Sequence, residues 1–305
     1  KLAPAAYIFS LFLSAAVLLF GQEINGSKRW LNLGPLSFQP SEFAKVAVIL
    51  FLTWQIEYSR RRTDGFWFMC RTMLTLLPIV GLVGSNNLST AIIIFCITMG
   101  LIFIAHPKVK PFLIAAGVGI VLIIIFVMIL SSSLETSSSF RLRRILVWLH
   151  PEDFASGDGY QTIQALYAIG SGGFLGRGLG NSIQKLGSVP EAQNDMIFSI
   201  VCEELGILGG IILLLLFAYL LYRLFFIAQN APDMFGSLMV SGIFIHIALQ
   251  VIFNIAVVLN LMPNTGVTLP LVSYGGTSIV FLMSEMGLAL SVARQIKFKE
   301  PERLL

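Results

Sequence analysis

The residues best suited to acid–base chemistry lie just before a long apolar segment. Asp195 closely precedes that segment, and Glu191 lies four residues earlier. If this stretch is helical, the spacing places both carboxylates on one face. A carboxylate at a water–lipid boundary can accept a proton from a sugar hydroxyl, which makes Asp195 a candidate general base. The alternative is structural, because an Asp before a helix is a common N-cap.

A second group of ionisable residues lies inside segments that are otherwise apolar. Glu42 and Lys45 are one helical turn apart at the start of one such segment. A charge in lipid is costly unless it is paired, so these residues predict structural ion pairs or hydrogen bonds between helices. For Glu42 and Lys45 a polar cavity open to the outer face is an equal alternative. The other members are Glu203, Glu204, Glu285 and His246, the last predicted to be a buried hydrogen-bonding side chain.

Basic residues gather in segments that we expect on the outer face of a membrane. Three arginines fall within four residues, at positions 141, 143 and 144. Attraction to lipid headgroups would explain such residues. So would a diphosphate leaving group, which needs positive charge focused on one spot. The full set is Lys28, Arg29, Arg141, Arg143, Arg144, Arg177 and Lys185.

Glycines are concentrated between residues 170 and 180. The stretch contains no G-x-G-x-x-G and no P-loop lysine, and no G-x-S-x-G is present. We predict a tightly folded loop in which small residues permit close backbone approach and positive φ angles. The alternative is that this loop lines the site of a flat polar substrate.

The composition excludes a water-soluble enzyme and a disordered chain. Apolar residues make up 56% of the 305 residues, charged residues only 12%, and the mean hydropathy is +0.84. A soluble protein carries about 25% charged residues because its surface faces water. The excess of 20 Lys and Arg over 16 Asp and Glu is small and forms no continuous basic stripe, so we predict no nucleic-acid partner.

The chain is therefore expected to be an all-α polytopic membrane protein. A bilayer crossing needs about 20 apolar residues. The pair of segments near 72–105 is short and contains Pro78, so we predict that it is broken or re-entrant. About eight crossings are predicted, at approximately 3–20, 42–57, 72–84, 88–105, 111–130, 196–222, 235–260 and 276–293.

The placement of Lys and Arg predicts the orientation in the membrane. Cytoplasmic loops carry the excess of these residues, which assigns Arg60–Arg62, Lys108 and the tail at 294–303 to the cytoplasm. An even number of crossings then puts both chain ends inside. Two extracellular loops remain, at about 21–41 and 131–195. No second domain is evident, so residues 1–305 are predicted to form one transmembrane domain, and no spacing indicates a metal site.

Several motifs together resemble the SEDS family of bacterial shape, elongation, division and sporulation proteins. They are Arg29-Trp30, Gln39-Pro40-Ser41-Glu42 to Lys45, Arg141 to Arg144, Gly159-Tyr160-Gln161, Gly178-Leu-Gly180 to Lys185, Pro190-Glu191 to Asp195, and Ser273-Tyr274-Gly275-Gly276-Thr277-Ser278. The loop residues are closer to the division and sporulation branch (FtsW and SpoVE) than to the elongation branch (RodA). The family has ten spans, and this chain resembles the part that begins at the third, so the first two are expected to be absent from it.

The resemblance implies a peptidoglycan glycosyltransferase of the bacterial cytoplasmic membrane. Such a protein polymerises lipid II into β-1,4 glycan at the outer face, for division or sporulation septum synthesis, and Asp195 matches the catalytic aspartate. Glu42 and Lys45 match functionally sensitive residues, and Glu191 lies in the Pro-Glu motif. Arg29, Lys45, Arg144 and Lys185, or a divalent cation such as Mg²⁺ or Mn²⁺, would neutralise the departing diphosphate.

The implied partners are lipid II, the growing undecaprenyl-diphosphate-linked glycan, a class B penicillin-binding protein and other divisome proteins. Two other functions stay open at this point. One is a lipid II flippase that uses the charges inside the spans as a path for the headgroup, although no inverted repeat is visible. The other is a non-catalytic scaffold that positions the penicillin-binding protein.

Overall fold

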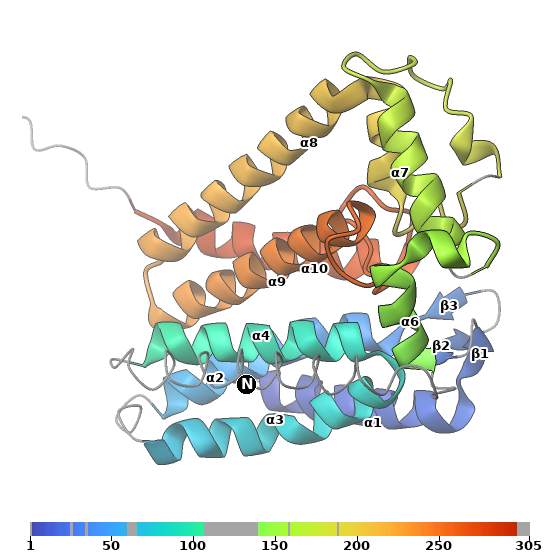
Figure 1. The fold of residues 1–305 in the computed structure, drawn as a ribbon. Helices are drawn as coiled ribbons and strands as arrows, with labels where there is room; N and C mark the ends of the chain where they lie inside the picture. The colour runs from blue at the N-terminus through green and yellow to red at the C-terminus, as the bar shows by residue number, and fades with distance from the viewer. Residues whose placement is uncertain are drawn as a thin grey trace, which may run out of the picture. The chain divides into compact units, whose positions relative to one another are not determined.

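The computed structural model describes residues 2–24, 27–33, 36–59, 66–106, 140–157, 159–187 and 189–297. These residues form nine α-helices, two short 3₁₀ helices and a small three-stranded sheet (Figure 1). Several predictions lie outside the described residues: the span at 111–130, Ser131–Ser139, the basic positions Arg60–Arg62 and Lys108, and the tail beyond residue 297.

The chain divides into two compact units. Unit 1 comprises Lys1–His106, Ala218–Ala248 and Gly276–Leu305, and unit 2 comprises Pro107–Phe217 and Leu249–Gly275. Two long helices contribute to both units: α8 (Ile197–Asn230) and α9 (Met234–Val258).

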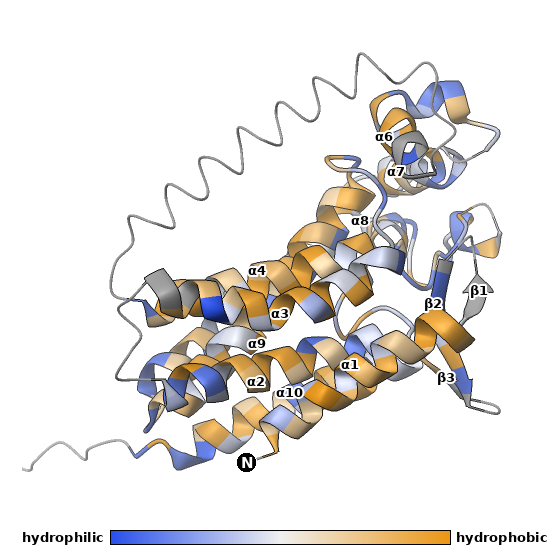
Figure 2. Ribbon diagram, turned by 90° about the horizontal axis from the view of Figure 1, so that it is seen from below, coloured by the Kyte–Doolittle hydropathy of each residue, from blue (hydrophilic) through white to orange (hydrophobic). Residues whose placement is uncertain are grey.

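Four helices pack together in unit 1: α1 (Ala3–Phe20), α2 (Pro40–Tyr58), α3 (Phe66–Asn86) and α4 (Leu88–Ala105) (Figure 1). Their residues are predominantly hydrophobic (Figure 2). Only Asn87 separates α3 from α4. Its side chain accepts a hydrogen bond from the Thr90 backbone N–H and so caps the start of α4. The last helix, α10 (Gly276–Gln295), packs against α2.

The third helix is longer than the sequence predicted. It begins at Phe66 and runs through Pro78 for 21 residues, so the pair near 72–105 consists of two full-length helices that pack against each other. Pro78 removes one backbone hydrogen bond, which a helix within a bundle tolerates.

A small antiparallel sheet occupies the first predicted outer loop. Its strands are β1 (Gln22–Ile24), β2 (Ser27–Leu33) and β3 (Leu36–Phe38), in the order β1-β2-β3. Trp30 pairs with Gln22, and Leu31 pairs with Phe38. The all-α prediction missed this sheet because its strands are too short to show a clear period of two.

Much of the second predicted outer loop is helical. Unit 2 contains α6 (Phe140–Leu149), η3 (Pro151–Phe154), α7 (Tyr160–Gly172) and η4 (Gln184–Leu186). The Trp148 indole N–H donates to the Asn260 carbonyl at 3.0 Å, which ties α6 to the turn after α9. These elements frame the segment that carries Asp195.

Five helices among the described residues are long and apolar enough to cross a membrane: α1, α4, α8, α9 and α10. They match the first, fourth, sixth, seventh and eighth predicted spans. The second and third predicted spans are helices α2 and α3, of 19 and 21 residues, which are not among these five. Several apolar helices of this length make the chain a multi-pass membrane protein.

Candidate active site

Asp195 lies in a turn-rich segment of unit 2, two residues before α8. Its side chain is buried, with 8% of the residue exposed. The helix begins at Ile197, so Met196 rather than Asp195 holds the N-cap position. Local helix capping therefore does not account for this carboxylate.

Three residues far away in the sequence anchor the backbone around Asp195. The Asn254 amide donates to the Asp195 carbonyl at 2.7 Å and to the Val267 carbonyl at 2.8 Å. The Ser273 hydroxyl donates to the Asn194 carbonyl at 2.5 Å, and the Tyr274 N–H donates to the Gln193 carbonyl at 2.8 Å. These bonds fix the chain direction on both sides of the carboxylate, as a site that needs a defined orientation requires.

A chain of polar contacts reaches the carboxylate itself. The Gln161 amide lies 3.4 Å from Asp195 Oδ1, and the Gln161 carbonyl oxygen accepts from the Asn264 amide at 2.9 Å. The Arg144 guanidinium in turn donates to the Asn264 backbone carbonyl at 3.4 Å. The structure thus brings Arg144 and Asp195 into one network, as the predicted site requires.

Burial raises the pKa of Asp195 to about 6, and the nearby Glu191 carboxylate acts in the same direction. Arg144 and the Gln161 hydrogen bond act in the opposite direction. The carboxylate is therefore mostly ionised at neutral pH, yet far more basic than an exposed aspartate. A general base works best when its pKa lies near the operating pH.

Glu191 does not share a helical face with Asp195, because the stretch is not helical, which was the condition for that placement. The segment between them consists of turns, and Glu191 itself has a φ of 52°. Its carboxylate accepts a hydrogen bond from the Asn194 amide. Pro190 at the preceding position and the long-range anchors on residues 193–195 favour turns over a helix here.

A cavity of about 600 Å³ adjoins this segment within unit 2. It is large enough for a small-molecule ligand. Asp195 is not in its wall, although its sequence neighbours are. The lining residues are Lys185, Leu186, Val189, Glu191, Ala192, Gln193, Ile197 and Ile200.

The glycine-rich stretch is a tightly folded loop, as predicted. Gly173, Gly176, Gly178 and Gly180 all have positive φ angles, between 58° and 96°. A Cβ atom on Gly176 would lie 2.2 Å from the Glu204 carbonyl oxygen. Both observations explain why small residues are needed.

Glu203 and Glu204 bind this loop, which corrects the prediction that they pair between helices. The Glu204 carboxylate lies 2.5 Å from the Lys185 ammonium, and the Glu203 carboxylate lies 3.6 Å from the Arg177 guanidinium. The loop folds over the first turns of α8, so its backbone N–H groups donate to both carboxylates.

The other intramembrane charges form a buried polar cluster in unit 1. The Lys45 ammonium lies 2.8 Å from the Glu42 carboxylate. His246 Nδ1 lies 2.9 Å from the Glu285 carboxylate. The predicted structural pairing is therefore found for Glu285, and His246 is a buried hydrogen-bonding residue as predicted.

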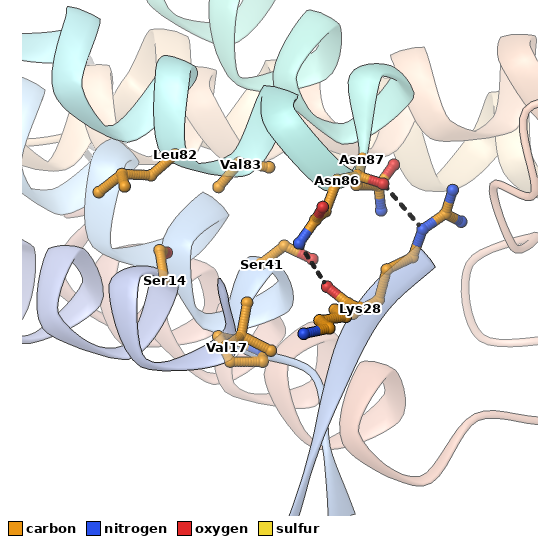
Figure 3. Close-up of a pocket in the computed structure, with 10 residues that line it drawn as sticks. Ser14, Val17, Lys28, Ser41, Leu82, Val83, Asn86 and Asn87 are labelled. Carbon is orange, nitrogen blue, oxygen red and sulfur yellow. Dashed lines mark hydrogen bonds between the residues drawn. The ribbon is translucent and has the colours of Figure 1, made fainter. Parts of the chain in front are cut away.

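Arg29 lines a small pocket of unit 1. Figure 3 shows this pocket, with Lys28 and Asn86 among the labelled residues. The Arg29 guanidinium Nε donates to the Asn86 carbonyl at 3.2 Å, and the Asn86 amide donates to the Lys28 carbonyl at 2.8 Å. Ser14, Val17 and Leu82 are among the other lining residues. The cavity of about 20 Å³ has space for about one water molecule, so it cannot itself hold a sugar.

The predicted site residues thus fall into two groups. Asp195, Glu191, Arg144 and Lys185 lie in unit 2, whereas Arg29, Glu42 and Lys45 lie in unit 1. Within the described ranges, no group of three or more His, Cys, Asp or Glu side chains could hold a metal ion.

Sequence reasoning missed two polar residues of the site, Asn254 and Asn264. Asn254 is fully buried in α9. An amide inside an otherwise apolar span was the available signal, because buried polar groups need partners.

Two relatives of established name are similar over nearly the whole chain. The probable peptidoglycan glycosyltransferase FtsW of Buchnera aphidicola subsp. Schizaphis graminum is 35% identical over 96% of this chain and 82% of that protein. The stage V sporulation protein E of Bacillus subtilis is 38% identical over 95% of this chain and 78% of that protein.

Solved structures show the same fold. One match is a chain of a peptidoglycan synthase complex, whose structure is described as showing the coordination of polymerization and crosslinking. It has a TM-score of 0.78 and 30% identity, over 98% of this chain and 82% of that one. The rod shape determining protein RodA of Thermus thermophilus matches with a TM-score of 0.67 and 30% identity, over 97% and 79%. The sequence pattern of the FtsW, RodA and SpoVE family, described as cell cycle protein, matches residues 1–298, and the chain belongs to this family.

Proposed function

We propose that this protein is a peptidoglycan glycosyltransferase that polymerises lipid II at the outer face of the bacterial cytoplasmic membrane, for division or sporulation septum synthesis. Relatives named as probable peptidoglycan glycosyltransferases support the activity, and a relative named stage V sporulation protein E supports the sporulation role. The observation that carries the proposal is the buried Asp195 carboxylate, with a pKa of about 6, in a segment whose neighbouring residues line a cavity of about 600 Å³. Both chain ends would lie in the cytoplasm.

In the proposed reaction, Asp195 accepts the proton of the acceptor sugar's 4-hydroxyl. The hydroxyl oxygen attacks C1 of the donor sugar with inversion, and the undecaprenyl diphosphate leaves. Arg144 and Lys185 of unit 2, or a divalent cation, would neutralise the diphosphate charge. In unit 1, Glu42 holds the Lys45 ammonium at 2.8 Å.

The expected partner is a class B penicillin-binding protein, together with other divisome proteins. A peptidoglycan synthase complex among the similar structures supports an assembly of polymerase and crosslinking enzyme. Proteoliposomes that receive lipid II only on the outer face test the function, with and without the penicillin-binding protein. Glycan made there supports a polymerase. A flippase would move lipid II and make no glycan, and a scaffold would do neither.

Activity should depend on pH through Asp195. The folded protein raises the pKa of this carboxylate from 3.8 to about 6, and only the ionised form can accept a proton. We therefore expect kcat/KM for lipid II to fall about tenfold per pH unit below about pH 6, and to level off above it. A pH–rate profile with an acid limb near pH 4 would contradict the raised pKa.

A further inference from the structure

The glycine loop is bound to α8 through the backbone. Gly206 interrupts the helix with a φ of 71° and a ψ of −174°. The Glu203 and Glu204 carbonyl groups accept hydrogen bonds from the N–H groups of Arg177, at 3.0 Å, and Gly178, at 2.9 Å. Beyond the kink, the Ile207 N–H donates to the Gly173 carbonyl at 3.0 Å.

The side chains of the same two glutamates hold the next part of the loop. The Glu204 carboxylate accepts from the backbone N–H groups of Gly180, at 3.0 Å, and Ser182, at 3.4 Å. The Glu203 carboxylate, fully buried, accepts from the N–H groups of Ile183, at 3.1 Å, and Gln184, at 3.3 Å. Such charge-assisted hydrogen bonds are about twice as strong as neutral ones. Residues 180–184 are thereby fixed against α8.

Lys185 is the residue that this arrangement orients. Its ammonium lies 2.5 Å from Glu204 Oε1 and 2.8 Å from the Gly180 carbonyl oxygen, and the side chain remains 32% exposed. The same side chain lines the cavity of about 600 Å³. A lysine side chain has several rotatable bonds. Because two contacts already fix it in the free protein, less side-chain entropy is lost when its ammonium binds a ligand.

We propose that Glu204 is a positioning residue that acts through Lys185. It holds the ammonium at the cavity wall, where the charge binds the diphosphate of the lipid-linked substrate. Glu203 supports the same geometry by fixing the backbone of residues 183 and 184. This inference rests on the proposed function, because it names the part of the substrate that Lys185 meets.

A double-mutant cycle of Glu204→Gln and Lys185→Ala tests the proposal in the full-length protein. The Gly180 and Ser182 N–H groups bind different oxygens of Glu204, so glutamine keeps an acceptor for one of them and loses the charge that holds Lys185. We expect Glu204→Gln to raise KM for lipid II about tenfold, which corresponds to ~1.4 kcal/mol, and to leave kcat within about twofold. Glu204→Asp should recover part of the loss.

The second mutation decides how Glu204 acts. In the Lys185→Ala background, Glu204→Gln should change KM by less than about twofold, because contacting residues are non-additive. Independent, multiplying losses would overturn the proposal. Glu152→Gln is the matched control, since Glu152 is an exposed carboxylate of the same unit.

A readout without catalysis separates this inference from the proposed function. Hydrogen exchange at Ile183 and Gln184, whose N–H groups bind Glu203, should remain slow in Glu204→Gln and become faster in Glu203→Ala, which loses the acceptor for both. If the wild-type protein makes no glycan, the proposed function fails, and the same cycle is measured on the Kd for lipid II. Additive losses of affinity there would overturn the positioning role.

Discussion

Asp195→Asn should lower the rate of lipid II polymerisation by about 10²–10⁴-fold, the usual contribution of a positioned general base. Asparagine has nearly the same shape and can still accept the Gln161 hydrogen bond, but it cannot take a proton at neutral pH. The backbone anchors from Asn254, Ser273 and Tyr274 do not involve the carboxylate, so the segment should keep its conformation.

The assay compares glycan formed per unit time by wild type, Asp195→Asn and Asp153→Asn. Asp153 is an exposed aspartate in η3 of the same unit, so its substitution should leave the rate unchanged. Thermal unfolding in detergent checks that Asp195→Asn remains folded. Polymerisation by this variant at close to the wild-type rate would refute the assignment of Asp195 as the base.

His246→Leu should lower the free energy of unfolding by about 1–3 kcal/mol, the cost of leaving a buried hydrogen-bonding group without its partner. The imidazole and the Glu285 carboxylate are 2% and 1% exposed, so neither can turn to water without local unfolding. Removal of the imidazole leaves the carboxylate among apolar residues. Glu285→Gln should cost less, because the amide keeps a hydrogen-bonding group opposite Nδ1 of His246.

Reversible denaturation in detergent micelles measures both variants. Ser284→Ala is a suitable control, since Ser284 is an exposed neighbour of Glu285 that bonds only to its own helix at the Val280 carbonyl. It should change the free energy of unfolding by less than about 0.5 kcal/mol. An equally small effect for His246→Leu would mean that the pair contributes nothing to stability.

The long apolar helices were predictable because each is a continuous apolar segment that can be recognised without knowledge of the rest of the chain. Residues 3–20, 88–105 and 276–293 are continuous apolar segments of crossing length, and the structure has helices at all three positions. The glycine loop was equally readable, since a run of glycines has few uses other than positive φ and close approach.

The contacts around the site were not predictable, because they join residues far apart in the sequence. Asn254 and Asp195 are 59 residues apart, and Asn264 and Gln161 are 103 apart. Neither separation leaves a period or a motif in the sequence. Glu203 and Glu204 were misjudged for a similar reason. Their partners lie in a loop 19 to 24 residues earlier in the sequence. No local pattern shows that this loop folds back onto the helix.

The break at Gly206 has a consequence for chimeric proteins. The interrupted turn of α8 supplies both the carbonyl and the carboxylate acceptors. The conformation of the glycine-rich segment therefore depends on the helix that follows it. Exchange of residues 173–186 alone between two relatives would join partners that did not evolve together. A functional transplant should extend to residue 207, so that the segment and its template move as one piece.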